Sequence, residues 1–320
     1  MAFKTPTLLI TFNRPEHTRK VLEEVKKQQP EKLFVFQDGA REGNVKDAEK
    51  CKAVQETIKK LVDWNCELHT NFSEKNLGCG KGPATAITWF FENVEEGIIL
   101  EDDAVPAKDF FGYAEELLQK YRNNNQIMVI GSINIDKKKY GKASYYFSMM
   151  NRNLCAWATW KRAWQHFDYF LENVTVQQLK NAMKFYGASS KEILYWSERL
   201  KEIHKDRLNE SSWDIQFLIS IWVNKGIGIC PNANLSTNIG FDEEATHTLY
   251  QKNPLSNVSV KSILPLIHPD NIKVQRNADL NYHKIYFAPY EYGWNGIRRI
   301  PYRINKRLKL WVGHEGKWFK

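Results

Sequence analysis

Glu101, Asp102 and Asp103 are the residues of this sequence whose type and spacing most clearly indicate chemistry. They directly follow the apolar run Ile98–Leu100, so we expect them at the carboxyl end of a strand, where open α/β sheets bind their ligands. Adjacent carboxylates repel one another, and a cation that also binds phosphate oxygens relieves this repulsion. Because Mg2+ and Mn2+ suit one or two carboxylates with diphosphate and water, we predict a Mn2+ or Mg2+ site for a nucleotide diphosphate. The alternative is an acidic turn before a helix near Asp109.

Polar residues also follow two other expected strands. The segment TFNRP, residues 11–15, ends the first strand, and QDG, residues 37–39, ends the second. Because carboxyl ends of neighbouring parallel strands meet at one edge of a sheet, Arg14 and Asp38 are expected beside the three acids. Arg14 suits a phosphate or a base, and Asp38 suits a donor group of a base or ribose. Each is equally explained by an ordinary helix entry or an Asp-Gly turn.

A glycine-rich segment, Asn76–Gly82 (NLGCGKG), precedes the expected third helix. Its glycines would allow the backbone to approach a sugar or phosphate closely, and Lys81 is its candidate donor-binding side chain. The spacing of the glycines differs from a Walker A loop and Pro83 follows, which disfavours an NTPase. The alternative is a glycine-rich helix entry that binds nothing.

Asp214 opens an apolar helical pattern directly after Trp213. Since the Glu101–Asp103 cluster is committed to donor and metal, a sugar transfer would need a separate carboxylate to deprotonate the acceptor hydroxyl. Partial desolvation at this position would raise the basicity of Asp214, so it is the candidate catalytic base. The alternative is a helix N-terminal acid favoured by the helix dipole.

The elements that must position these residues alternate in the first 130 residues. Apolar runs recur about every 30 residues, the size of a βαβ unit, at Thr7–Phe12, Lys32–Gln37, Cys66–Thr70 and Gly97–Leu100. Helical patterns lie between them, at Glu16–Gln28, Val45–Leu61 and Gly80–Asn93. We therefore predict an α/β fold with a mostly parallel central sheet flanked by helices.

The chain becomes aromatic and helix-rich after Gly131. Helices are predicted at Lys161–Phe170, Val176–Tyr186, Lys191–Lys205 and Trp213–Asn224, followed by a short strand at GIGI and a polar loop from Pro231 to Thr248. The tryptophans are core candidates, although one or two of Trp157, Trp160 and Trp213 would also suit stacking on an acceptor sugar.

Composition and charge limit the class of protein. The 320 residues suffice for one large domain or two packed subdomains. The 46 Lys and Arg against 37 Asp and Glu give a net charge of +9, which favours polyanionic partners such as phosphorylated substrates or anionic lipid; nucleic acid is not among our predicted partners. Five scattered cysteines without a CxxC pair indicate a reducing compartment. Without a run of roughly 18 apolar residues, we expect a cytoplasmic protein.

The last part of the chain, Tyr290–Lys320, interleaves basic residues with tryptophans. Such a tail suits peripheral contact with the anionic inner face of a membrane. The alternative is a solvated basic helix that packs on the domain through its tryptophans.

Taken together, the motifs resemble one known family. TFNRP, QDG, GIILEDDAVPAKDFF, AWATWKRAW, WDIQF and NIGFDEEATHT are similar to the inverting N-acetylglucosaminyltransferase I family and its bacterial relatives, over roughly residues 5–250. The most specific piece is EDD followed shortly by Asp-Phe-Phe. The resemblance implies the GT-A (Rossmann-like) fold with a helix-rich acceptor side, and a place in bacterial polysaccharide biosynthesis. The chain departs from the family in its glycine segment and in lacking a membrane anchor and disulfide-forming cysteines.

The resemblance also implies roles for individual residues. Arg14 and Asp38 would contact the nucleotide. Within the acidic cluster, Glu101 would meet the donor sugar, Asp102 the ribose side and Asp103 the metal. Asp214 would be the catalytic base, and a flexible loop at Asn238–His247 would close over the donor, with Thr246 and His247 near the diphosphate.

We therefore predict a metal-dependent inverting glycosyltransferase, of the hexosyl- or N-acetylhexosaminyl-transferring kind. It would move a sugar from a UDP-linked donor, with UDP-GlcNAc as one candidate, to a hydroxyl of a glycan or glycolipid. The predicted regions are a nucleotide-sugar-binding part (1–135), an acceptor-side part with base and lid loop (136–250) and the basic extension (251–320).

Two alternatives to this function remain. A sugar nucleotidyltransferase usually carries a glycine-rich loop with Arg and Lys after the first strand, which TFNRPEHT does not provide. A non-catalytic polyanion-binding module would not need three acids at a strand end.

Overall fold

The computed structural model describes residues 3–136, 138–150, 156–205, 212–240 and 258–287. Within these ranges, eight strands form one sheet in the order β3-β2-β1-β4-β8-β6-β9-β7. Their bounds are β1 Thr7–Thr11, β2 Lys32–Gln37, β3 Glu67–Phe72, β4 Glu96–Glu101, β6 Ile127–Gly131, β7 Tyr145–Ser148, β8 Trp157–Trp160 and β9 Ile227–Pro231. The strands β3, β2, β1 and β4 are parallel neighbours, and β8 and β7 run antiparallel to theirs. The predicted α/β fold with a mostly parallel sheet is confirmed.

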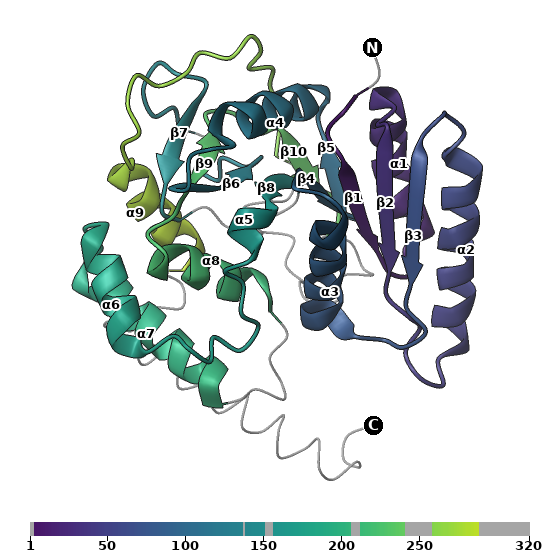
Figure 1. The fold of residues 1–320 in the computed structure, drawn as a ribbon, viewed down its shortest axis with the longest axis horizontal. Helices are drawn as coiled ribbons and strands as arrows, with labels where there is room; N and C mark the ends of the chain where they lie inside the picture. The colour runs from purple at the N-terminus through teal and green to yellow at the C-terminus, as the bar shows by residue number, and fades with distance from the viewer. Residues whose placement is uncertain (1–2, 137, 151–155, 206–211, 241–257, 288–320) are drawn as a thin grey trace, which may run out of the picture.

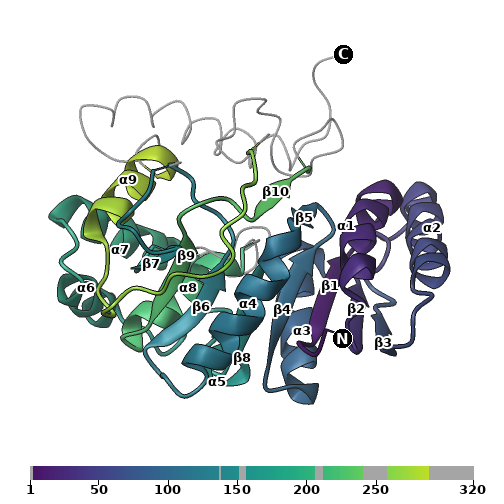
Figure 2. The ribbon, with the colours of Figure 1, turned by 90° about the horizontal axis from the view of Figure 1, so that it is seen from above.

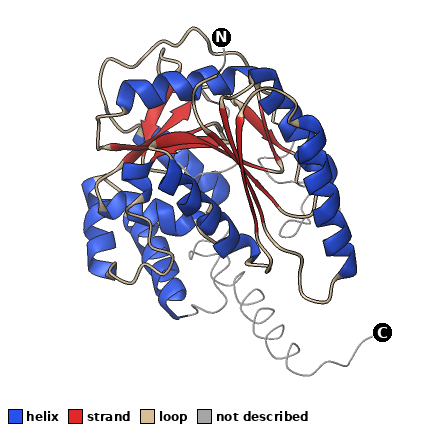
Figure 3. Cartoon of the chain, turned by 45° about the vertical axis from the view of Figure 1, so that its right-hand side comes forward, coloured by secondary structure: helices blue, strands red, loops and turns tan. Residues whose placement is uncertain are grey.

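Helices cover both faces of the sheet, as Figure 3 shows. Their bounds are α1 Pro15–Gln28, α2 Val45–Leu61, α3 Gly78–Asn93, α4 Lys108–Tyr121, α5 Lys161–Trp164, α6 Val176–Phe185, α7 Ser190–Lys205, α8 Asp214–Val223 and α9 Arg276–Tyr286. In Figures 1 and 2, α1, α2 and β3 lie at one end of the molecule and α6, α7 and α9 at the other.

Alternate residues of the central strands face opposite helical layers. Leu9, Val35 and Leu100 are buried with α1, α2 and α4, whereas Leu8, Phe36 and Ile99 are buried with α3 and α8. Both faces are apolar, as the continuous apolar runs in the sequence require. The acids that follow Leu100 are therefore carried by a strand buried on both sides.

Local sequence determines where several helices begin. Pro15 is the first residue of α1, where its missing N–H costs nothing. Asn44 caps α2 by accepting from the backbone N–H of Asp47. Thr175 and Gln178 form a reciprocal capping box at α6.

Two features of the second half differ from the sequence-based expectation. The strands β7 and β8 were not predicted, although both are fully buried in the central sheet. The predicted helix Lys161–Phe170 is wrong beyond Trp164. There, Asp168 accepts from the backbone N–H groups of Phe170 and Glu172, and this turn competes with helical hydrogen bonding.

A second, two-stranded sheet joins distant parts of the chain next to the acidic cluster. Strand β5 (Ala104–Pro106) immediately follows Asp103, and β10 (Ser236–Asn238) pairs with it in antiparallel register. The start of the polar segment predicted as a lid is thereby fixed beside the acids.

The proposed division at residues 135 and 250 stays a prediction. The central sheet does not divide at residue 135, since β7, β8 and β9 of the second part belong to the same sheet as β1–β4. Within the described ranges, no helix is both long enough and apolar enough to cross a bilayer. The basic tail that we considered for membrane contact lies outside these ranges.

Gly97 of β4 provides a test of this packing. A Cβ at this position would lie 2.4 Å from Phe90 Cζ and 2.7 Å from the Pro6 carbonyl oxygen. Because overpacking a core typically costs 1–3 kcal/mol, we expect Gly97→Ala to lower the free energy of unfolding by roughly that amount in urea denaturation. Gly112→Ala, which meets only the tip of Leu264 at 3.3 Å, is the control, and equal stability of both variants would contradict the packing.

Candidate functional site

The predicted acids lie where the strand order changes direction. Chain order runs from β1 to β2 on one side and returns to β4 on the other, and such a switch point is where α/β sheets bind ligands. Ile10 of β1 is opposite Glu101 of β4. The backbone N–H of Phe12 donates to Asp102 Oδ2 at 3.3 Å. Asp102 thus links the ends of both strands.

Arg14 lies beside Asp103, as the sequence predicted. Its Nη1 is 3.4 Å from Asp103 Oδ2, and the two side chains are only 12% and 22% exposed. Arg14 is the residue that precedes α1, so the helix N-terminus and the guanidinium bring positive potential to the same edge.

The pKa of each of the three carboxyl groups is raised, chiefly by burial. The pKa of Glu101 is raised well above its usual value by burial and then by the charges of Asp103, Asp102 and Asp214. Burial and Asp103 raise the pKa of Asp102 to about 7. Burial also raises the pKa of Asp103, and the charges of Arg14 and His17 offset this only in part. The three acids therefore lie in a largely desolvated place, which the charge of Arg14 compensates only in part.

Three acids at the end of one strand fit a hard divalent cation. Oxygen ligands and negative charge are what Mg2+ and Mn2+ select. Among the described residues, no group of three or more His, Cys, Asp or Glu side chains could hold a metal ion. A cation here would therefore take phosphate oxygens and water as further ligands, which is usual for Mg2+.

Asp214 reaches the same site from the second half of the chain. It is the first residue of α8, and its charge contributes to the raised pKa of Glu101. Trp213, which precedes it, stacks on Trp157 with ring centroids 5.6 Å apart. Trp157 and Trp160 are 0% and 1% exposed, so these two tryptophans belong to the core and do not offer a platform for a sugar.

Asp38 is engaged within the protein. Its carboxylate accepts from the backbone N–H groups of Gly39, Leu77 and Gly78 at 3.0, 2.8 and 2.9 Å. Asn76 Nδ2 donates to it as well, at 3.2 Å. Burial raises its pKa, and the backbone N–H groups act in the opposite direction. In this arrangement, Asp38 anchors the glycine-rich segment to the end of β2, and nucleotide contact by this residue stays a prediction.

The glycine-rich segment is shaped by contacts inside the chain. Gly78 has a φ of +79°, which favours glycine. A Cβ on Gly82 would meet Asp38 Oδ2 at 3.3 Å. Lys81, by contrast, is exposed in the first turn of α3, on the strand-end side of the sheet where the donor was predicted.

Thr246 and His247, our remaining predicted donor-binding residues, lie outside the described residues. Sequence reasoning missed His17, whose Nε2 lies 3.2 Å from the carbonyl oxygen of Ile239 and whose charge acts on Asp103. The spacing could have indicated His17, because it follows Arg14 by three residues at the start of a helix. Residues three apart lie on the same helix face.

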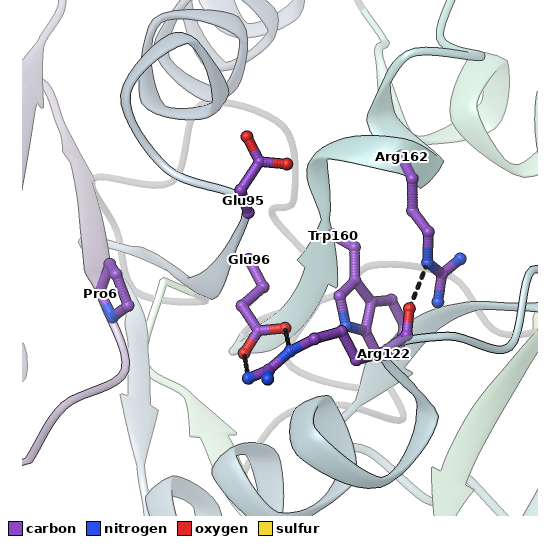
Figure 4. Close-up of a pocket in the computed structure, with 6 residues that line it drawn as sticks. All are labelled: Pro6, Glu95, Glu96, Arg122, Trp160 and Arg162. Carbon is purple, nitrogen blue, oxygen red and sulfur yellow. Dashed lines mark hydrogen bonds and ion pairs between the residues drawn. The ribbon is translucent and has the colours of Figure 1, made fainter.

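A pocket of about 410 Å3 lies at the opposite edge of the sheet. Pro6 precedes β1, Glu96 begins β4 and Trp160 ends β8, so this edge is away from the acids. Figure 4 shows the residues that line the pocket. Its charged side chains are engaged: Arg122 pairs with Glu96, and Arg162 donates to three backbone carbonyls. We assign no site there.

Comparisons with known proteins find similar solved structures but no family. No model of a protein family matches the sequence, and no curated protein matches it. Solved structures do. A cytidylyltransferase from Leptospira borgpetersenii is 12% identical over 52% of this chain and 63% of its own, less than two thirds of its length, with a TM-score of 0.30. A UDP-glucose pyrophosphorylase complexed with UDP-glucose is 9% identical over 71% and 90%, with a TM-score of 0.38. An inositol-1-phosphate CTP transferase from T. maritima is 10% identical over 54% and 76%, with a TM-score of 0.31.

These structures correct our prediction of an inverting glycosyltransferase. The three are a cytidylyltransferase, a UDP-glucose pyrophosphorylase and a CTP transferase, which is the class of the alternative that we kept, a sugar nucleotidyltransferase. The coarser prediction of a nucleotide-sugar-related transferase fold is supported. At this level of identity the likeness concerns the fold, and the roles of residues must be argued from this chain's own geometry.

The contacts of Asp38 lead to a prediction. Asp38→Ala leaves the partly buried N–H groups of Leu77 and Gly78 without their acceptor, and an unsatisfied buried donor typically costs about 1–3 kcal/mol. We expect urea denaturation without nucleotide to show a loss of roughly that size, and a smaller loss for Asp38→Asn, which keeps one acceptor oxygen. Unchanged stability combined with lost nucleotide binding would instead make Asp38 a ligand-contacting residue.

Proposed function

We propose that this chain is a metal-dependent sugar nucleotidyltransferase, which joins a nucleoside triphosphate and a sugar phosphate to form a nucleoside diphosphate sugar and pyrophosphate. The observation that carries the proposal is the cluster Glu101–Asp103 with Arg14 at the switch point between β1 and β4. Such a cluster suits a cation and the phosphates that complete its coordination.

In this reaction an oxygen of the sugar phosphate attacks the α-phosphorus of the triphosphate. A new P–O bond forms, the bond from the α-phosphorus to the bridging oxygen breaks, and pyrophosphate leaves with the electron pair. A divalent cation held at Asp103 would neutralise charge on the phosphate oxygens. No covalent intermediate with the protein is needed, so positioning and charge are the main contributions of the chain.

The residues of the site would divide this work. Asp103 would hold the cation, since it is the partly exposed acid beside Arg14. Arg14 would meet a phosphate, in exchange for its long 3.4 Å contact with Asp103. Asp102 would keep the ends of β1 and β4 together through Phe12.

The connection from β1 to α1 differs from the glycine-rich, Arg- and Lys-containing loop usual in this class. It offers Arg14 and no glycine. The triphosphate would therefore depend more on the cation and on Lys81, which is exposed in the first turn of α3.

Asp214 would have a different task from the one predicted. A sugar phosphate is already ionised near neutral pH, since its second pKa is about 6, so no base is needed to deprotonate the nucleophile. Asp214 lies close enough to raise the pKa of Glu101. We propose that its negative charge contributes to the electrostatic potential where the sugar phosphate binds.

The direct test is pyrophosphate release. The full chain is incubated with Mg2+ or Mn2+, each of UTP, CTP, dTTP and GTP, and a panel of sugar 1-phosphates. Stoichiometric pyrophosphate and nucleotide sugar are expected for at least one pair. Transfer of sugar from a nucleotide sugar without pyrophosphate chemistry would overturn the proposal, and metal-dependent binding without turnover would favour a binding module.

Asp103→Asn should weaken metal-dependent nucleotide binding, because the cation loses its anionic protein ligand. We expect the thermal stabilisation by nucleotide with Mn2+ to fall sharply, while the melting temperature in EDTA is kept. The matched control is Asp109→Asn, an acid of α4 that bonds Ser262 away from the cluster. An unchanged Mn2+ titration in the Asp103 variant would remove Asp103 from the site.

Asp214→Asn distinguishes the two chemistries. If the nucleophile is a sugar phosphate, turnover should change less than the roughly 10²–10⁴-fold that loss of a general base costs. The measurement is kcat across pH 6–9 with the best substrate pair. A loss of the larger size, together with loss of the acidic limb of the pH profile, on which protonation of a base lowers the rate, would make Asp214 a general base and contradict this assignment.

A further inference from the structure

The turn Asn238–Gly240 lies directly against Asp103, although more than a hundred residues separate them. Asn238 is opposite Ala104 in the β10–β5 pair. The backbone N–H of Ile239 donates to the carbonyl oxygen of Asp103 at 2.9 Å. Asp103 is therefore held by a segment from the second half of the chain as well as by its own strand.

The side chain of Asn238 bridges this turn and the Asp103 carboxylate. Its Nδ2 donates to Asp103 Oδ1 at 3.4 Å, and its Oδ1 accepts from the backbone N–H of Gly240 at 2.7 Å. The bridge needs one donor and one acceptor on the same short side chain, which an amide provides and a carboxylate does not.

Gly240 makes room for the same carboxylate. A Cβ at this position would lie 2.2 Å from Asp103 Oδ2 and 2.9 Å from its Cβ and Cγ. The backbone of Gly240 is not in the left-handed region, since its φ does not lie between +20° and +160°. Proximity to Asp103, and not backbone conformation, is thus the reason for glycine here.

We propose that Asn238 and Gly240 are positioning residues that fix the direction of the Asp103 carboxylate toward the bound divalent cation. Asn238 sets Oδ1 through its amide, and Gly240 leaves the space in which Oδ2 lies. His17 supports the turn from α1 through the carbonyl oxygen of Ile239, 3.2 Å away. This inference rests on the proposed function, because it takes Asp103 as the metal ligand.

The first experiment measures Mn2+ binding by electron paramagnetic resonance with UTP present, in the wild type, Gly240→Ala, Asn238→Asp and Gly112→Ala. Loss of groups that orient a metal ligand typically costs 10–100-fold in metal affinity. We expect a loss of this order in the two turn variants and none in Gly112→Ala. Nucleotide affinity in EDTA is measured alongside, and it should be equal in all four proteins, whereas general damage to the fold would lower it.

The second experiment needs no metal. If the Gly240 methyl clashes with the Asp103 side chain, Gly240→Ala should lower the melting temperature in EDTA, and the loss should shrink in an Asp103→Gly background. An equal loss in both backgrounds would show that the methyl meets something else and would overturn the role of Gly240.

The outcomes separate the inference from the proposed function. If the wild type binds no Mn2+ and Asp103→Asn changes nothing, the proposed function fails, whatever the turn variants do. If the wild type binds Mn2+ and Asp103→Asn abolishes it, but Gly240→Ala and Asn238→Asp bind as the wild type does, only the positioning inference fails.

Discussion

The concentration of carboxylates at the end of β4 is the constraint on which the site depends. Burial raises the pKa of Glu101, Asp102 and Asp103, and the charge of Asp103 raises the pKa of the other two further. The surroundings compensate with donors and positive charge: the Phe12 N–H, the Arg14 guanidinium and the Asn238 amide all point to these acids. The compensation is incomplete, since two of these three contacts are as long as 3.4 Å. That remaining imbalance is what a cation with bound phosphate would relieve.

The fold explains why such an unfavourable cluster persists. The strand β4 is buried on both faces, so the hydrophobic free energy of the strand fixes the position of the acids that follow it. The small β5–β10 sheet then holds Asp103 from the other side. Strained or repulsive groups persist only where surrounding structure determines their position, and here two sheets do so.

The fold and the location of the site were predictable because they depend on local periodicity. Apolar runs predicted β1 to β4, and strand ends predicted that Arg14 would meet the acids. Strands β7 and β8 were not predicted because four-residue aromatic segments show no clear hydrophobic period. Their strand conformation comes from pairing with strands that are distant in sequence. The engagement of Asp38 by Leu77 and Gly78 escaped for the same reason: it is a contact across about forty residues that no local pattern encodes.

The wrong functional prediction has a physical reason as well. Acids at the end of a central strand and a basic residue after β1 serve any enzyme that holds a nucleotide's phosphates through a cation. These residues hold the phosphate group that leaves, and a phosphate leaving group is common to glycosyl transfer and nucleotidyl transfer. What separates the two reactions is the attacking group: a neutral hydroxyl needs a base, and a sugar phosphate does not. That difference lies on the α8 side, where Asp214 is the acid beside Glu101. A motif of residues that hold phosphate therefore identifies the site without identifying the reaction. The function depends on whether Asp214 removes a proton from the nucleophile.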